Sequence, residues 1–386
     1  MDTGSEERAR GVTVDLAQHH FATATASFTI LDAPGHRDFV PAMLGGAAMA
    51  DLAVLVVDAN QLASGMKGQT REHVLLAKAA GVPRLVVAVN KLDASAPVAW
   101  SQSLFEDVQA QVRDFLTGVG FDDVLVVPCS GLRGENVVHA PPATDAASPT
   151  AWIRTHHHPT LLQALERSLP APPSPQTLHA PLRLPIADVF RGSPTTPLSI
   201  SGRLRTGHIQ TGDTLLIQPS GALAHVRGIV VAAAPRDYAV AGELPTLHLH
   251  LSSDVDAAGV RSGDLACAPQ HPVRCVKGFA ARIEAVEALL PQAVEVCLGR
   301  LQVAGRVGAL VCTVEAGGTG AVVRRRPRVV RAGERAVVRV GFGGGGGEGE
   351  GEGEGQGGKW PVERGERVVL RCGGVTVGFG AVEEVG

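Results

Sequence analysis

Short, continuous apolar runs alternate with helical patterns in the first part of the chain. Runs of four to six residues that are rich in β-branched side chains are typical of strands buried on both faces of a parallel sheet. Four such runs occur, at Phe28–Leu31, Leu52–Val57, Leu85–Val89 and Val124–Val127. Helical patterns lie at Phe39–Ala50, Thr70–Ala80 and Leu104–Val119. We expect Thr70 to be an N-cap, and Gly81 and Gly120 to follow the ends of their helices.

The pattern changes after residue 181, where short strands are separated by turns that contain glycine. The strand patterns are Leu182–Phe190, Leu198–Leu204, Thr214–Gln218, His225–Val231, Leu247–Leu251 and Gly263–Leu265. This spacing predicts a closed antiparallel barrel. A second set of strand patterns runs from Val273 to the end and predicts a second barrel. The tract from Gly343 to Gly358 is almost entirely Gly and Glu, so we expect a disordered insertion that projects from a hairpin.

Strands that alternate with helices predict a doubly wound α/β sheet with right-handed crossovers. We therefore expect an α/β domain at residues 1–170, a linker at 171–180, and antiparallel barrels at 181–271 and 272–386, the second with the insertion at 343–358. A length of 386 residues is enough for two or three domains.

Composition narrows the class of protein. The net charge of −3 provides no overall basic field for nucleic acid. The strongly basic patch Arg324-Arg325-Arg326-Pro327-Arg328 has two open interpretations: contact with RNA phosphates, ribosomal RNA included, or a solvated guard on a sheet edge. Six cysteines without a C-x-x-C pair, and an N-terminus unlike a signal peptide, favour a reducing, cytoplasmic compartment. His156-His157-His158 is expected to be a solvated loop rather than a metal site.

Polar residues follow the first apolar run directly, in the order Asp32-Ala33-Pro34-Gly35-His36. Ligands of open α/β sheets bind beyond the carboxyl ends of the strands, and an Asp there can hold Mg²⁺. Gly35 has no Cβ, so its N–H can approach a phosphate. His36 is placed where a side chain could orient an attacking water.

Two further polar loops follow the third and fourth runs. Asn90-Lys91-Leu92-Asp93 offers a carboxylate, Asp93, that can accept hydrogen bonds from N1 and the 2-amino group of guanine. Asn90 can hold neighbouring loops, and the stem of Lys91 can cover the base. Ser130-Gly131-Leu132 forms a turn whose backbone N–H can meet the guanine carbonyl. Because three such loops each end an apolar strand, the sequence predicts a guanine-nucleotide site.

These segments, together with Glu6–Asp15 and Gly68–His73, resemble the translational GTPases related to EF-Tu and eukaryotic elongation factor 1-alpha. The resemblance implies a GTP-binding domain followed by two β-barrels, with GTP hydrolysis triggered by the ribosome. It implies that Thr13 senses Mg²⁺ and the γ-phosphate, and that Asp32 lies on the Mg²⁺ side. It also implies that Gly35 bonds the γ-phosphate and that His36 positions the hydrolytic water.

One motif of that family has no match. The phosphate-binding loop G-x-x-x-x-G-K-[ST], and the strand before it, would precede Met1. The similar segment Gly353–Trp360 has Trp where Ser or Thr must hold Mg²⁺, and we interpret it as linker. We therefore expect a truncated chain that binds GTP far more weakly than a complete one. A partner-binding fragment that does not hydrolyse GTP is the alternative.

The family contains factors with different partners. Val56–Ala59, Ser130–Asn136 and Gly202–Asp213 look most like the GTPase partner of Pelota, a tRNA-mimicking protein, in rescue of stalled ribosomes and no-go decay. Phe39–Pro41, Leu44–Ala47 and Pro128–Gly131 look somewhat like the GTPase partner of the termination factor. A tRNA-delivering elongation factor is the third alternative. The sequence favours the rescue factor.

Overall fold

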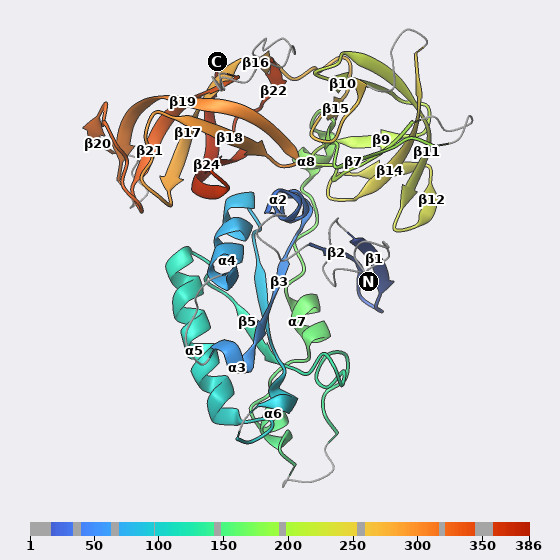
Figure 1. The fold of residues 1–386 in the computed structure, drawn as a ribbon. Helices are drawn as coiled ribbons and strands as arrows, with labels where there is room; N and C mark the ends of the chain where they lie inside the picture. The colour runs from blue at the N-terminus through green and yellow to red at the C-terminus, as the bar shows by residue number, and fades with distance from the viewer. Residues whose placement is uncertain are drawn as a thin grey trace. The chain divides into compact units, whose positions relative to one another are not determined.

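The computed structural model describes residues 17–33, 40–62, 69–95, 97–142, 148–192, 198–252, 259–315, 321–343 and 358–386. The chain divides into two compact units (Figure 1). The first contains residues 1–20, 29–49 and 172–386, and the second contains residues 21–28 and 50–171. No helix in the described ranges is both long and apolar enough to cross a membrane.

A three-stranded parallel sheet is the centre of the second unit. It has the order β3–β4–β5, formed by β3 (Ala53–Asp58), β4 (Leu85–Asn90) and β5 (Leu125–Pro128). The central strand β4 is buried from Leu85 to Val89, which explains its continuous apolar sequence. The helical elements are α3 (Ala59–Leu62), α4 (Gln69–Ala80), η2 (Leu92–Ala94), α5 (Gln102–Val119), α6 (Ala151–Thr155) and α7 (Leu161–Arg167).

Helix α5 packs its apolar face against the sheet. Phe105, Val108, Val112 and Leu116 recur at helical spacing, and all are buried in one cluster with Val87 and Val89 of β4. The hydroxyl oxygen of Ser101 accepts a hydrogen bond from the N–H of Leu104 and caps the helix. Gly120 ends it with a φ of 89°, a left-handed conformation that glycine adopts without strain, as predicted.

Three expectations for this region need correction. The run Phe28–Leu31 lies in β2 (Ser27–Asp32), which pairs with β1 (Ala17–Ala22) in a separate two-stranded sheet and, among the described strands, does not join β3–β4–β5. Stacking of Phe21 on Phe28, with ring centroids 4.9 Å apart, holds this pair of strands together. Strand β3 exposes Val54 and Val56, so only one of its faces is covered. Helix α4 begins at Gln69, so Thr70 lies inside the helix and is not its N-cap.

The first barrel closes through one continuous segment. Its strands are β6 (Arg183–Pro185), β7 (Asp188–Phe190), β8 (Leu198–Ser201), β10 (Thr214–Gln218), β11 (Ala222–Val231), β12 (Ala234–Arg236), β14 (Pro245–Leu251) and β15 (Leu265–Cys267). The hydrogen-bonded order is β6–β15–β10–β11–β14–β8–β7, with every pairing antiparallel. Strands β6 and β7 stand at opposite ends of this order but follow each other in the chain, separated by residues 186–187. The two ends of the sheet therefore meet. Strands β9 (His208–Gln210) and β13 (Tyr238–Val240) form a small separate sheet.

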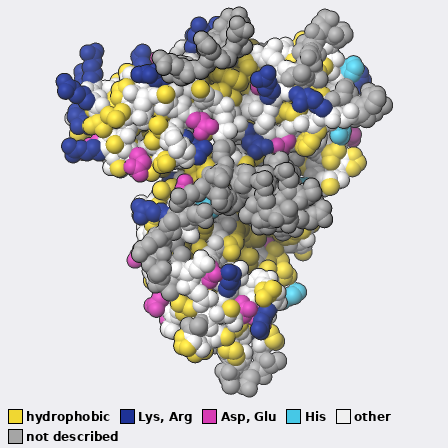
Figure 2. All heavy atoms as spheres, in the orientation of Figure 1, with side chains coloured by type: hydrophobic (Ala, Val, Ile, Leu, Met, Phe, Trp, Pro, Cys, Tyr) yellow, Lys and Arg dark blue, Asp and Glu magenta, His cyan; other side chains and the backbone are white. Residues whose placement is uncertain are grey.

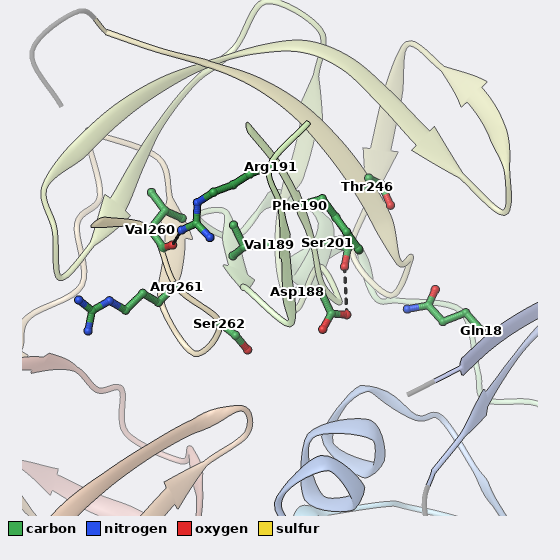
Figure 3. Close-up of a pocket in the computed structure, with 10 residues that line it drawn as sticks. All are labelled: Gln18, Asp188, Val189, Phe190, Arg191, Ser201, Thr246, Val260, Arg261 and Ser262. Carbon is green, nitrogen blue, oxygen red and sulfur yellow. Dashed lines mark hydrogen bonds between the residues drawn. The ribbon is translucent and has the colours of Figure 1, made fainter. Parts of the chain in front are cut away.

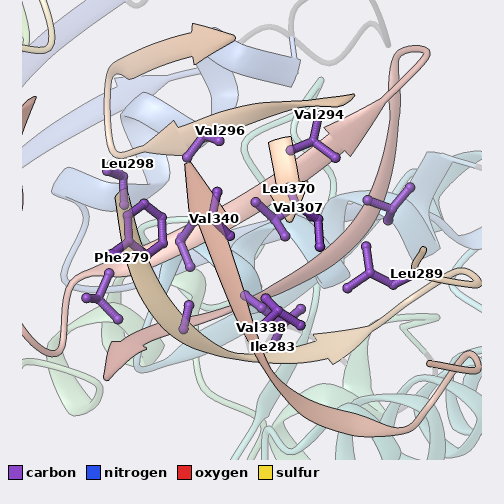
Figure 4. Packing of buried hydrophobic residues seen from close by; sticks show 14 of the residues in the cluster. Phe279, Ile283, Leu289, Val294, Val296, Leu298, Val307, Val338, Val340 and Leu370 are labelled. Atoms are coloured by element: carbon purple, nitrogen blue, oxygen red, sulfur yellow. The ribbon is translucent and has the colours of Figure 1, made fainter. Parts of the chain in front are cut away.

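The second barrel is a closed ring of six strands. They are β17 (Gly278–Ala285), β18 (Ala293–Leu298), β19 (Leu301–Val314), β21 (Arg335–Phe342), β23 (Arg367–Cys372) and β24 (Val375–Val385). The order β18–β23–β24–β17–β21–β19 closes because β18 also pairs with β19. Apolar side chains from every strand fill the interior (Figure 4). Strand β20 (Val322–Arg325) extends from β19 outside this ring, and β16 (Cys275–Val276) pairs with β22 (Trp360–Pro361).

Ion pairs join the two barrels within the first unit. Arg183 pairs with Glu363 over 2.8 Å, and Arg205 pairs with Glu366 over 2.8 Å. Helix α2 (Val40–Met49) also belongs to this unit, as does α8 (Pro175–His179). Gly45 of α2 lies against the side chain of Arg300, so a Cβ at this position would force that side chain to move. Residues 344–357, the centre of the predicted insertion, lie outside the described residues.

Candidate nucleotide site

The carboxyl ends of the three parallel strands bring polar side chains to one edge of the sheet. Asp58 is the last residue of β3 and lies in register with Asn90, the last residue of β4. Strand β5 ends at Pro128, and the next residue, Cys129, donates its N–H to the carbonyl of Val89 over 2.9 Å. The loops that contain Asn90 and Ser130 therefore leave the sheet side by side, as the sequence predicts for a ligand site.

Asn90 connects these two loops through one atom. Its Oδ1 accepts the backbone N–H of Lys91 over 2.8 Å and the backbone N–H of Gly131 over 2.8 Å. A Cβ on Gly131 would lie 3.5 Å from the Asn90 amide atoms, which is ordinary contact. The side-chain oxygen of Asn90 therefore holds the two loops together, and its role toward a nucleotide stays a prediction.

Asp93 is held in a short 3-10 turn beside the sheet. Leu92, which is fully buried, anchors the turn, and its carbonyl accepts the N–H of Trp100 over 2.7 Å. The Asp93 side chain is 9% exposed, and its Oδ2 lies 3.4 Å from Nε of Arg133, whose side chain is 62% exposed. A guanine base that bound the Asp93 carboxylate would share it with Arg133 or replace this ion pair.

Lys91 pairs with the strand next to its own. Its Nζ donates to Oδ2 of Asp58 over 2.8 Å. Burial raises the pKa of Asp58, but the hydrogen bonds from Lys91 and from the N–H of Asn60 outweigh burial, so this pKa lies below its usual value. The same hydrogen bond raises the pKa of Lys91. Lys91 has a φ of 64°, which directs the chain away from β4 into the turn with Asp93.

The turn after β5 contains both fixed and exposed residues. Ser130 is buried, and its hydroxyl oxygen accepts the N–H of Arg133 over 3.3 Å. Leu132 is 92% exposed, so its side chain and backbone are open to a ligand. Burial raises the pKa of the Cys129 thiol to about 11, and the neighbouring Asp93 carboxylate adds to this shift. Cys129 is therefore a neutral, buried thiol beneath the loops.

The remaining predicted site residues are in other places. Thr13, Gly35 and His36 lie outside the described residues. Asp32 ends β2 and belongs to the first unit, whereas Asn90, Lys91, Asp93, Ser130, Gly131 and Leu132 belong to the second. In the described ranges no group of three or more His, Cys, Asp or Glu residues is placed to hold a metal ion. The assignment of Mg²⁺ to Thr13 and Asp32 stays a prediction.

Three residues of this edge were missed as site residues in the sequence. Asp58, Arg133 and Asn136 all contact the predicted loops or support them. The Nδ2 of Asn136 donates to the carbonyls of Pro128, over 2.8 Å, and Pro159, over 3.1 Å, and thereby fixes the chain after Ser130. Asp58 ends an apolar strand, as Asn90 does, and this signal could have identified it. Arg133 and Asn136 had no comparable signal because their partners are distant in sequence.

The histidine triplet is partly structural. His158 packs edge-on against Phe105 and Trp152, with ring centroids 5.1 Å and 5.5 Å apart. His156 follows the end of α6 and is exposed. The expectation of a fully solvated loop is wrong for His158, because the aromatic side chains around it cover part of its ring.

The first unit has a separate pocket of about 660 Å³ at its first barrel (Figure 3). Asp188 lies in this pocket and accepts a hydrogen bond from the hydroxyl of Ser201 over 3.4 Å. Arg191 donates to the carbonyl of Val260 over 2.8 Å on another wall. None of the predicted nucleotide-site residues that the structure describes lines this pocket.

Similarity to known proteins agrees with this arrangement. Residues 1–171 match the family described as "Elongation factor Tu GTP binding domain". The chain is 34% identical to elongation factor 1-alpha of Picrophilus torridus over 350 residues, which are 88% of this chain and 77% of that protein. It is 33% identical to protein HBS1 of Drosophila melanogaster over 395 residues, which are 100% of this chain and 55% of that protein.

A solved structure of the translation elongation factor SelB from Methanococcus maripaludis, in complex with the GTP analogue GPPNHP, has the same fold. Its TM-score is 0.70 at 19% identity, and the alignment covers 100% of this chain and 77% of that one. This similarity concerns the fold alone. The sequence identity to elongation factor 1-alpha, together with the matched GTP-binding domain, shows that the chain belongs to the EF-Tu and elongation factor 1-alpha family of translational GTPases.

Proposed function

We propose that this chain is a ribosome-dependent GTPase that acts with a Pelota-like, tRNA-mimicking partner in rescue of stalled ribosomes and in mRNA surveillance. One observation carries the choice of partner: the similarity to HBS1 extends over 100% of the chain, whereas the similarity to elongation factor 1-alpha of Picrophilus torridus extends over 88%. Ser130–Asn136, one of the segments that resemble the Pelota-partner GTPase, contains Arg133, which pairs with Asp93.

Guanine recognition is the part of this proposal that the described residues support. The Asp93 carboxylate would accept hydrogen bonds from N1 and the 2-amino group of guanine, which adenine cannot donate. One such charged hydrogen bond contributes about 1.5–3 kcal/mol. The stem of Lys91 and the exposed Leu132 would lie against the base, and the backbone of Ser130, Gly131 and Leu132 would meet the guanine carbonyl. Asn90 would keep the two loops in register.

Hydrolysis would depend on residues of the segment that precedes α2 and on Thr13. Thr13 and Asp32 would hold Mg²⁺, which supplies charge stabilisation for the phosphates. The N–H of Gly35 would bond the terminal phosphate, and His36 would orient the attacking water when the ribosome engages the factor. Asp32 is the described member of this set and stands at the end of β2.

We propose the same division of the chain that the sequence predicts. Residues 1–170 would form the partial GTP-binding domain, 171–180 the linker, 181–271 the first barrel and 272–386 the second. In this proposal the factor works in the cytoplasm, where ribosomes are found, and the barrels carry the partner. Three ion pairs between the barrels support their acting as one body: Arg183 with Glu363, Arg205 with Glu366, and Arg300 with Asp188.

A tRNA-delivering elongation factor is the second candidate, because elongation factor 1-alpha of Picrophilus torridus is 34% identical to the chain. Immobilised full chain, loaded with a non-hydrolysable GTP analogue, separates the candidates. It is incubated in parallel with a Pelota-like protein, a termination factor and aminoacyl-tRNA. Retention of the Pelota-like protein alone is expected. Selective retention of aminoacyl-tRNA would overturn the proposal in favour of elongation, and retention of the termination factor would assign the chain to termination.

A ribosome-stimulated GTPase assay tests the catalytic part separately. The full chain is expected to release phosphate from GTP faster when ribosomes are added, and His36→Ala is expected to remove this stimulation. Partner binding without any stimulated hydrolysis would identify the chain as a binding fragment that does not act as an enzyme.

A further inference from the structure

Positive charge is concentrated in one short segment of the second barrel. Residues 321–335 contain six arginines and one glutamate, in a chain whose net charge is −3. Lys and Arg side chains gather at the end of the first unit where Figure 1 draws β20, as Figure 2 shows. We call Arg324, Arg325, Arg326 and Arg328 the arginine ribbon.

Strand β20 contributes nothing to the core of the barrel. Among the described strands it pairs with β19 alone, with Arg325 opposite Cys312 and Arg324 opposite Thr313. All four of its residues are exposed. Successive side chains of a strand point to opposite faces, so Arg324 and Arg325 present one cation on each face of β20, the edge strand beside β19. A strand that only completed the barrel would bury one of these faces.

Exposed valines argue against a simple edge guard. Val322 is 51% exposed and Val323 is 68% exposed, and Val311 of β19, whose carbonyl accepts the N–H of Arg326, is 38% exposed. A guard keeps other chains away by placing charge where apolar surface would attract them. Here apolar side chains remain exposed next to the arginines, on both β19 and β20. The segment therefore has the properties of a contact surface rather than of a protected edge.

The backbone of the arginine ribbon is fixed. The N–H of Arg326 donates to the carbonyl of Val311 over 2.9 Å, and Nη2 of Arg324 donates to the carbonyl of Val329 over 3.0 Å. Pro327 is buried, and Val330 forms a bridge with Leu289. Because the chain is held on both sides of the turn, binding would order only the arginine side chains and would cost less entropy than ordering a loop.

Three of the four arginines of the ribbon have no carboxylate partner among the residues that the structure describes. Arg324 pairs with Glu334 over 3.3 Å. Among the described residues, no carboxylate forms an ion pair with Arg325, Arg326 or Arg328, all of which are exposed. Three guanidinium groups are therefore available to an anionic partner.

We infer that the arginine ribbon binds the phosphate backbone of double-helical RNA. The segment has arginine and no lysine, and guanidinium groups match phosphate oxygens in pairs. It has no aromatic residue to stack on bases, so it recognises the backbone and not the sequence. Cations on both faces of an exposed edge strand contact phosphates on both sides of a groove.

Membership of the translational GTPase family favours RNA over an acidic protein as the binding partner of the arginine ribbon. Translational GTPases act on the ribosome, where helical RNA is the most abundant polyanion. The inference rests on this family membership and on the ribbon, and it does not depend on which protein is the partner in the proposed function. RNA binding can be measured without nucleotide or partner, so the failure of one proposal is distinguishable from the failure of the other.

The test uses the full chain and a fluorescent RNA duplex of about 20 base pairs, a length that covers a typical double-stranded RNA footprint. Binding is followed by anisotropy over a range of salt concentrations. The test variant changes Arg325, Arg326 and Arg328 to Gln. The matched control changes three other exposed arginines, Arg227, Arg364 and Arg367, to Gln, which alters the net charge equally. Thermal unfolding of both variants checks that the barrels remain folded.

The test variant is expected to bind RNA at least tenfold more weakly than the unchanged chain, and its log–log salt slope is expected to fall by about 2–3 because three phosphate contacts are lost. The control is expected to retain its affinity within about threefold. Equal loss in both variants would overturn the inference, because it would reduce the effect to overall charge. If polyglutamate displaced the fluorescent duplex more readily than unlabelled RNA does, the surface would be assigned to an acidic protein. This result would also overturn the inference.

Discussion

The backbone N–H of Gly131 donates a hydrogen bond to Oδ1 of Asn90 over 2.8 Å, and this bond joins the loops that follow β4 and β5. The same oxygen accepts the N–H of Lys91, so the residue at the end of β4 aligns both loops. A base that contacts Asp93 on one loop and the Gly131 turn on the other needs this alignment before it binds. Asn90 therefore positions the backbone of both loops, and we propose that this is its role toward a bound base.

Replacing Asn90 with Ala should release the Gly131 turn. Loss of the acceptor is expected to lower the free energy of unfolding by about 0.5–1.5 kcal/mol, the usual contribution of a hydrogen bond of this kind. The more specific result is local: amide hydrogen exchange of Gly131 should become faster by more than the change in global stability explains. Asn90→Asp is the control, because it keeps the oxygen acceptor. Equal exchange at Gly131 in both variants would show that Asn90 does not hold the turn.

Asp264, in the first barrel, should limit stability at neutral pH. Burial raises its pKa from 3.8 to about 6, although the N–H of Arg261 donates to its Oδ2 over 2.9 Å. A raised folded pKa means that the folded state holds a proton which the unfolded state releases, so stability is full below pH 3.8 and falls as pH rises through about 6. Asp264→Asn should therefore increase the free energy of unfolding at pH 8, by about 1–3 kcal/mol.

The control for this prediction is the same variant at low pH. At a pH below 3.8 the carboxyl of Asp264 is largely neutral in both states. The Asp264→Asn variant and the original chain should then have nearly equal stability, because the side-chain oxygen of asparagine can still accept the Arg261 N–H. Urea unfolding at low pH and at pH 8 measures the difference. A variant that is less stable at pH 8 would show that other contacts compensate the ionised carboxylate.

The lowered pKa of His158 predicts that the stability of the second unit depends on pH. Burial against Phe105 and Trp152 lowers its pKa, and the nearby positive charges of His156 and Arg113 add to this shift, while Glu106 opposes it. A lowered folded pKa means that the unfolded state binds a proton first as pH falls below 6.5. The unfolding free energy should therefore decrease from about pH 6.5 downward until the folded state is protonated too.

The variant His158→Phe should flatten this dependence, because it keeps the aromatic contacts and removes the titrating ring. His157→Phe, at an exposed neighbour, serves as its control and should leave the pH dependence unchanged. Thermal melts between about pH 5 and 8 compare the three proteins. If the original chain and His158→Phe lost stability in parallel as pH fell, another group would be responsible.

The buried strands and the barrels could be predicted from the sequence, because their patterns are local. Leu85–Val89 is apolar without interruption, and β4 is buried at all of these positions. Phe28–Leu31 has a similar pattern, yet β2 is only partly buried and pairs with β1. Composition could not distinguish a strand at the centre of a sheet from one in a two-stranded hairpin, since both need β-branched and aromatic residues.

The candidate site shows the same limit. Asn90, Asp93 and Gly131 were predicted because each follows an apolar strand at its carboxyl end. The ion pairs of Lys91 with Asp58 and of Arg133 with Asp93 were not predicted, because they depend on the angle at which each loop leaves the sheet. Whether the arginine segment guards a sheet edge or contacts RNA depends on where β20 lies. Strand β20 lies outside the ring of six strands, and the sequence pattern does not predict this position.

If the loops of Asn90, Asp93 and Gly131 recognise guanine, a guanine nucleotide and an adenine nucleotide must act on them differently. Titration of the ¹⁵N-labelled full chain with GDP, and separately with ADP, tests it directly by the chemical shift of the Gly131 amide, and it does so even where affinity is low. GDP is expected to shift the amide signals of Gly131 and Asp93, whereas ADP is expected to leave them unchanged. The Asp93→Ala substitution is expected to abolish the effect of GDP. Equal shifts with both nucleotides, or shifts confined to residues away from these loops, would contradict guanine recognition by them.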